Sequence, residues 1–162
     1  MSRSHNTSQN IVYSMSRSHN TLQNIVYSMI EFNREIQYTH TKNADLYLSN
    51  VCYARSCQTV AFNPGRQVGK TTLIASCIGE NDIAISSNTC SMEELKRKMS
   101  FFNAGLQQAI NVHTLNPADF KGFAKETFDI VWVDNASVMS EDDIQKIYLA
   151  FAGICKQFVF IG

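Results

Sequence analysis

The sequence has no run of about 18 apolar residues, and it does not begin with a charged segment followed by an apolar one. A membrane-spanning helix needs such a run and a secretory signal needs such a start, so the sequence supports neither. The chain also lacks an excess of charge, because 14 basic residues balance 14 acidic ones. No strong overall field therefore attracts it to nucleic acid or to an anionic membrane.

Cysteine and histidine are present, but in no pattern that forms a disulfide framework or a zinc site. The five cysteines are odd in number and include no C-x-x-C pair, and the four histidines lack metal-ligand spacing. This usage favours reduced thiols, so we expect a cytoplasmic protein. The chain has 162 residues and 44% of them are hydrophobic, which is enough for one domain with a core.

The first 28 residues are a 14-residue segment present twice, MSRSHNTSQNIVYS followed by MSRSHNTLQNIVYS, which differ only in Ser8 against Leu22. Two copies of this length are too few and too short for a repeat array with its own core. The segment is rich in serine, asparagine and histidine, so we expect residues 1–28 to be a poorly ordered leader. The folded domain is then predicted to span residues 29–162.

Short apolar segments with strand and helix character alternate along the rest of the chain. The predicted strands are 57–62, 82–87, 109–114, 128–134 and 157–161. Helices are predicted between them, including one that begins at Lys70, one that Ser91 and Glu94 would cap, and one that Ser140 and Asp143 would cap. The alternation predicts an α/β fold in which helices flank a parallel sheet on both faces.

The stretch 63-NPGRQVGKTT-72 joins the first predicted strand to the helix that follows it. Its end matches the phosphate-loop consensus G-x-x-x-x-G-K-[ST], in which backbone N–H groups surround the phosphates of a nucleotide. The start deviates, because Pro64 stands where the first glycine is expected and Gly65 comes one place late. Strand, loop and helix in this order favour a phosphate loop over a chance G-K-T sequence at a helix start.

Each residue of this loop has a predicted role. Gly69 allows close approach of the backbone, Lys70 provides a cation for the β- and γ-phosphates, and Thr71 provides a hydroxyl ligand for magnesium. We therefore predict ATP and Mg²⁺ as cofactors. The predicted nucleotide-binding residues are Gly65, Arg66, Gln67, Val68, Gly69, Lys70, Thr71 and Thr72.

A second predicted site element follows the apolar run 128-FDIVWVD-134. Asp134 at the end of this strand is predicted to hold magnesium together with Thr71. The next position, where a catalytic base is expected, is Asn135, and an amide can orient water but cannot accept a proton. We therefore expect ATP binding with weak hydrolysis, unless Glu141 or Asp142 takes the place of the base from the next helix.

Arg66 lies in the loop four residues before Lys70. It can be held by a surface carboxylate, or it can fold over the γ-phosphate and stabilise the charge that develops during phosphoryl transfer. The string RQVGKTT resembles the phosphate loop of large terminase subunits, the viral and phage DNA-packaging ATPases, which often contain R-Q-x-G-K-T. That resemblance implies a RecA-like ATPase domain and a catalytic role for Arg66 beside Lys70, Asp134 and Asn135.

The same resemblance implies partners. They are double-stranded DNA and a portal or small terminase subunit, and a homo-oligomer is also expected. A nuclease domain would lie beyond the ATPase domain, so this chain is expected to be an incomplete motor without its C-terminal part.

Two alternatives remain open. The phrase VDNASVMS and the later QFVFIG are similar to motifs of superfamily 1 helicases, which also use a RecA-like domain. The chain would then be a helicase fragment. The other alternative is a nucleotide-binding interaction module in which Asn135 keeps ATP unhydrolysed.

Overall fold

The structure is a computed structural model that describes residues 5–40, 49–65, 68–102 and 108–162. Helices and strands alternate after a long first helix. The elements are α1 (His5–His40), α2 (Asn50–Cys57), β1 (Thr59–Phe62), α3 (Lys70–Cys77), β2 (Ile83–Ser86), α4 (Thr89–Phe102), β3 (Ala109–Asn111), the 3₁₀ helices η2 (Val112–Thr114) and η3 (Pro117–Phe120), β4 (Phe128–Asp134), the 3₁₀ helix η4 (Ala136–Val138), α5 (Glu141–Phe151) and β5 (Cys155–Ile161).

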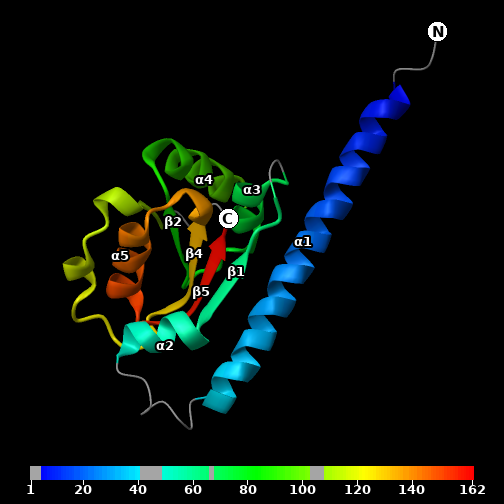
Figure 1. Cartoon of the computed structure of the whole chain (residues 1–162). Helices are drawn as coiled ribbons and strands as arrows, with labels where there is room; N and C mark the ends of the chain where they lie inside the picture. Colours follow the sequence, from blue (N-terminus) through cyan, green and yellow to red (C-terminus); the bar gives the residue numbers. More distant parts are fainter. Residues whose placement is uncertain (1–4, 41–48, 66–67, 103–107) are drawn as a thin grey trace.

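The strands form one sheet in the order β1-β5-β4-β2-β3, and every neighbouring pair is parallel (Figure 1). The α/β class and the parallel sheet predicted from the sequence are therefore confirmed. Each of the five predicted strands is present, but β3 ends at Asn111 instead of residue 114. The side chain of Asn111 accepts a hydrogen bond from the backbone N–H of His113, which turns the chain into η2.

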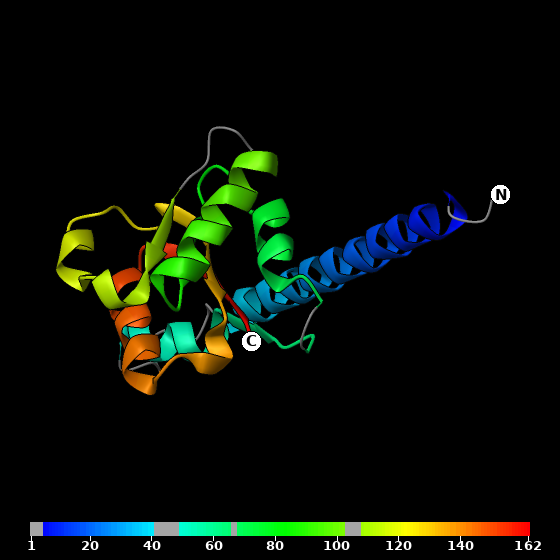
Figure 2. The same cartoon turned by 90° about the horizontal axis from the view of Figure 1, so that it is seen from above.

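Helices cover both faces of the sheet, as predicted (Figures 1 and 2). The crossovers through α3 and α4 run toward the β3 edge of the sheet, whereas the crossover through α5 runs toward the β1 edge. Right-handed crossovers in opposite directions place their helices on opposite faces. Two cores result: one lies beneath α1, α3 and α4 and contains Leu73, Leu95 and Trp132, and the other lies beneath α2 and α5 and contains Phe151 and Phe158.

The long helix α1 packs against the domain through a stripe of apolar residues spaced four apart. Val26 and Ile30 are buried, and Leu22 is half-buried beside them. The expected boundary between residues 28 and 29 falls inside this helix, and Figures 1 and 2 show its N-terminal part extending past the rest of the domain. Although α1 is long, no helix in the described part of the chain is apolar enough to cross a membrane.

Capping residues explain where the helices near the sheet begin. The capping box predicted for α5 is confirmed, since the Ser140 side chain and Asp143 bond each other's backbone N–H groups. The cap predicted for α4 is wrong. Asn88, not Ser91, accepts the first-turn hydrogen bond, from the backbone N–H of Ser91 at 2.9 Å. Ser91 therefore lies inside the first turn of α4, and its hydroxyl is available for other contacts.

The register of the sheet brings polar residues together at the carboxyl ends of the strands. One row crosses all five strands and consists of Phe62, Ile161, Asp134, Ser86 and Asn111. Ligands of parallel α/β sheets bind outside this end of the strands. The row, together with the loop between β1 and α3, marks the candidate site.

Candidate functional site

The loop between β1 and α3 depends on two glycines with left-handed backbone conformations. Gly65 has φ +89° and Gly69 has φ +77°, values that side chains other than glycine rarely tolerate. The side-chain oxygen of Asn63 accepts a hydrogen bond from the N–H of Gly65 at 3.1 Å and fixes the turn after Pro64. The shifted glycine of the sequence motif therefore has a structural role of its own.

Two predicted nucleotide-binding residues of this loop, Arg66 and Gln67, lie outside the described residues. On the described side of that gap, Val68 and Gly69 are exposed ahead of α3.

The start of α3 has the properties of an anion-binding helix end. Among the described residues, no side chain caps it, and its first turn contains no acidic residue. Its leading N–H groups and its dipole therefore favour a negatively charged ligand. Lys70, Thr71 and Thr72 form this turn and are partly buried. The ammonium group of Lys70 donates a hydrogen bond to the main-chain oxygen of Gly162 at 2.6 Å, which places the cation at the end of β5.

The two predicted magnesium ligands are in direct contact. The Thr71 hydroxyl donates a hydrogen bond to Oδ2 of Asp134 at 3.0 Å, although the residues are 63 positions apart in the sequence. A hydroxyl has one proton and two lone pairs, so Thr71 can keep this bond while a lone pair binds a metal ion. The strand β5 separates β1 from β4 in the sheet, so the first turn of α3 contacts a strand that is not paired with β1.

Asp134 is fully buried and incompletely paired. Burial raises the pKa of its carboxyl group, while hydrogen bonds from Thr71 and from the backbone N–H of Asn135 oppose that rise. Its Oδ1 atom has no hydrogen-bond partner among the described residues. An unsatisfied buried polar atom costs about 1–3 kcal/mol, so the carboxylate is held ready for a ligand at the expense of stability.

We expect Asp134→Asn to unfold at a higher temperature than the wild type at pH 7 without ligand, by roughly 2–4 °C, or on the order of 1 kcal/mol. A carboxyl whose pKa is raised by folding is destabilising once it ionises. The advantage of the variant should therefore be absent below the unfolded pKa of about 3.8 and grow as the pH rises through the raised folded pKa. Melting curves between pH 3.5 and 7.5 measure it.

Asp129→Asn is the matched control on the same strand. A hydrogen bond from Lys156 lowers the pKa of Asp129, so its carboxylate contributes stability above its unfolded pKa and loses that contribution as the pH falls. The sign of the effect should therefore be opposite. If Tm depended on pH in the same way in Asp134→Asn and in the wild type, the carboxylate of Asp134 would not be destabilising.

Asn135 follows Asp134 directly and has a left-handed backbone, with φ +57° and ψ +38°. Asparagine adopts this conformation more readily than most residues. Its amide nitrogen donates to the Ser91 hydroxyl at 3.5 Å, a long hydrogen bond. The amide therefore lies between the end of β4 and the first turn of α4, beside the predicted magnesium ligands.

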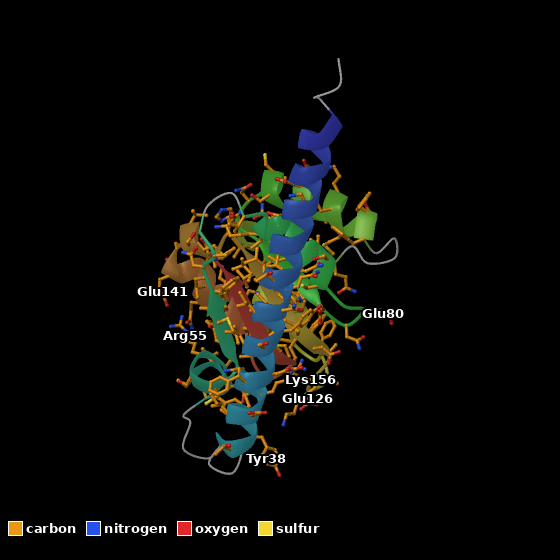
Figure 3. The ribbon with its side chains drawn as sticks, turned by 90° about the vertical axis from the view of Figure 1, so that its right-hand side faces the viewer. Tyr38, Arg55, Glu80, Glu126, Glu141 and Lys156 are labelled. Atoms are coloured by element: carbon orange, nitrogen blue, oxygen red, sulfur yellow. The ribbon has the colours of Figure 1, made fainter. Side chains whose placement is uncertain are left out.

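Of the two residues that could replace a catalytic base, Glu141 is held by an ion pair on the surface. Glu141 forms an ion pair with Arg55 of α2, with 2.6 Å between the guanidinium and carboxylate groups (Figure 3). Both side chains are on the surface, and Arg55 also bonds Gln145. Glu141 and Asp142 belong to the acidic first turn of α5, where negative charge stabilises the helix dipole.

Ser86 and Ser91 belong to the neighbourhood of the site, a position that the sequence did not predict for either residue. Ser86 is the partner of Asp134 in the register between β2 and β4, and it is fully buried. Its hydroxyl has no hydrogen-bond partner among the described residues. A polar residue at the end of an otherwise apolar strand is the sequence signal that could have indicated it.

Neither models of known protein families nor curated protein sequences match the chain. The assignment of the site therefore depends on its geometry and on the residues of the loop.

The side-chain oxygen atoms of the site are of the kind that bind magnesium. The described residues include no group of three or more histidine, cysteine, aspartate or glutamate side chains that could hold a metal ion. Magnesium differs from transition metals in this respect, because it is commonly bound by one or two carboxylates together with the phosphates of its substrate. The Thr71 hydroxyl, Asp134 and its unpaired Oδ1 fit an ion that arrives with a nucleotide.

A separate cavity of about 590 Å³ lies at the opposite end of the sheet, where the strands begin. Phe120, Phe123 and Phe128 line it with residues from the starts of β2 and β3. Its mainly apolar wall does not suit a triphosphate, so we assign it no part in the candidate site.

Proposed function

We propose that the chain is an ATP-binding domain of the RecA-like type, similar to the ATPase motor of a terminase large subunit. The observation that carries this proposal is the 3.0 Å hydrogen bond between Thr71 and Asp134. It joins the hydroxyl of the G-K-T sequence to the acid at a strand end, which are the two groups that hold magnesium in nucleoside triphosphatases with a phosphate loop. The pairing of two distant sequence motifs is hard to explain by chance.

Three further features support nucleotide binding. The loop lies at the carboxyl end of a parallel sheet, where α/β domains bind their ligands. The uncapped start of α3 offers N–H groups to phosphate. Lys70 lies in the same region with its ammonium group on the main-chain oxygen of Gly162, a partner that a phosphate oxygen can replace.

We also propose that hydrolysis by the isolated chain is weak. Asn135 occupies the position of the expected base, and its amide cannot take the proton of an attacking water. Glu141 is engaged by Arg55 and does not substitute for it. These two observations also favour a second candidate function, a nucleotide-binding interaction module that keeps ATP intact. The two proposals share the binding site and differ in turnover.

The nucleic acid and the protein partners that we propose follow from the resemblance of the loop to that of terminases. They are double-stranded DNA, a portal or small terminase subunit, and further copies of the chain. A helicase fragment would use the same site with a different nucleic acid. We propose a cytoplasmic location, in the host cell if the protein is viral, because free cysteines favour a reducing compartment.

Addition of ATP and MgCl₂ at about 100 times the dissociation constant is expected to stabilise the wild type by about 2.7 kcal/mol, a rise in Tm of roughly 5–10 °C. The rise should be smaller with ATP and EDTA, because Asp134 then faces the phosphates without a cation. Differential scanning fluorimetry with ATP, ADP and inorganic phosphate measures it. An unchanged Tm at millimolar ATP with magnesium would reject the proposed function.

A further inference from the structure

The clearest unexplained feature near the site is a pair of buried oxygen atoms on adjacent strands. Ser86 and Asp134 are register partners in β2 and β4, and both are 0% exposed. Oγ of Ser86 and Oδ1 of Asp134 are two of the buried side-chain atoms that have no hydrogen-bond partner within the described residues. Unpaired buried groups are uncommon in native proteins and call for a ligand or another cause.

The register places both side chains on the same face of the sheet. Two residues earlier, Ala84 and Trp132 are also register partners, and both belong to the core beneath α3 and α4. Because side chains alternate along a strand, Ser86 and Asp134 point to that same face, toward the helix that begins with the phosphate loop. The contact between Asp134 and Thr71 of α3 agrees with this direction.

The residues that flank Ser86 and Asp134 in the row across the sheet do not supply the missing hydrogen bonds. On the β5 side of Asp134 the row continues with Ile161, which offers no polar group. On the far side of Ser86 it continues with Asn111, whose amide already donates to Thr89 and whose oxygen accepts from the N–H of His113. Within the described residues, Oγ of Ser86 and Oδ1 of Asp134 are the two side-chain oxygen atoms of this row that are buried without a hydrogen-bond partner.

We propose that Ser86 is a positioning residue for magnesium, and that its hydroxyl and Oδ1 of Asp134 together accept hydrogen bonds from the hydration shell of the nucleotide-bound ion. This inference rests on the proposed function. A carboxylate repels phosphate and attracts a hydrated cation, so the pair suits the ion rather than the nucleotide. Magnesium dehydrates reluctantly and keeps several waters, which need acceptors of this kind.

The role predicts that Ser86→Ala weakens the response to magnesium without destabilising the ligand-free protein. Without ligand, removal of an unpaired buried hydroxyl should leave Tm unchanged or raise it. With ATP present, the MgCl₂ concentration at half-maximal stabilisation should increase about 10-fold, since outer partners of metal sites typically contribute 10- to 100-fold to affinity. The response to ATP in EDTA should stay equal to that of the wild type.

The experiment is a MgCl₂ titration at fixed ATP, followed by differential scanning fluorimetry, on the wild type, Ser86→Ala and Ser87→Ala. Ser87 is the matched control, because it is the next residue, is also buried, and accepts a hydrogen bond from Asn88. Its replacement should not move the magnesium midpoint. Ser86→Cys, which is close to serine in size, gives the same comparison if the alanine variant does not fold.

Several outcomes would overturn the inference. The proposed role of Ser86 would be wrong if the magnesium midpoint of Ser86→Ala were unchanged, if Ser87→Ala shifted it equally, or if Ser86→Ala bound ATP more weakly in EDTA. None of these three results would argue against nucleotide binding by the wild type. A marked fall in Tm of ligand-free Ser86→Ala would show that the hydroxyl is a structural group. Absence of any ATP response in the wild type would instead reject the proposed function and the inference together.

Discussion

Lys70→Ala is expected to weaken ATP binding about 100-fold and to abolish the thermal stabilisation by ATP and magnesium. A charged hydrogen bond contributes about 1.5–3 kcal/mol, and 2.7 kcal/mol corresponds to roughly 100-fold in affinity. Lys70 is the lysine of the G-K-T sequence, and its ammonium group lies beside the end of β5. Isothermal titration calorimetry and fluorimetry with ATP measure the loss.

The variant should remain folded without ligand, because Lys70 is only partly buried and, within the described residues, its ammonium group makes one hydrogen bond, to Gly162. Loss of that bond is expected to lower the free energy of unfolding by about 1 kcal/mol. Lys121→Ala is the control, since it removes an exposed lysine distant from the loop in sequence. ATP binding that survives Lys70→Ala at wild-type strength would contradict a phosphate-binding role for this loop.

Asn135→Glu is expected to raise ATP turnover by roughly 10²–10⁴-fold, the usual contribution of a general base. Asn135 lies directly after the predicted magnesium ligand Asp134, so a carboxylate there can accept the proton of an attacking water. The left-handed backbone opposes the change, because glutamate tolerates it less well than asparagine, at a cost of about 1–2 kcal/mol. Steady-state phosphate release measures turnover.

Asn135→Asp and Asn135→Ala complete this experiment. Aspartate tolerates the left-handed conformation and tests a carboxylate with less backbone strain, whereas alanine removes the amide and adds no base. We expect turnover to increase in the two acidic variants and not in Asn135→Ala. Wild-type turnover already equal to that of both acidic variants would show that another group, such as Arg66 or a partner chain, controls hydrolysis.

Local sequence patterns predicted those parts of the fold that depend on nearest neighbours. The run 128–134 is apolar because β4 is buried on both faces, and its final aspartate marks the end of the strand. Ser140 and Asp143 stand at the spacing of a capping box, and both hydrogen bonds are present. The G-K-T sequence likewise begins α3 after a strand, and it lies beside Asp134 as the motif requires.

Features that depend on tertiary contacts were not predicted. The polar composition of residues 1–28 suggested a leader, but Leu22 and Val26 continue into Ile30 with the four-residue spacing of a helix that packs on α3. Ser91 has the correct spacing for a cap, yet Asn88 precedes it and is better placed to accept its N–H. The importance of Ser86 arises from the register with β4, which is a property of the sheet and not of β2.

The arrangement of α1 has a consequence for self-association. Strands at the margin of a sheet offer unpaired backbone groups to other chains and promote aggregation. In this protein α1 contacts β1 at one margin (Figures 1 and 3). At the other margin β3 is only three residues long. Both margins are therefore poor templates for a foreign strand. Removal of α1 should promote aggregation in two ways, because it uncovers the β1 margin and also exposes the core that Val26 and Ile30 cover.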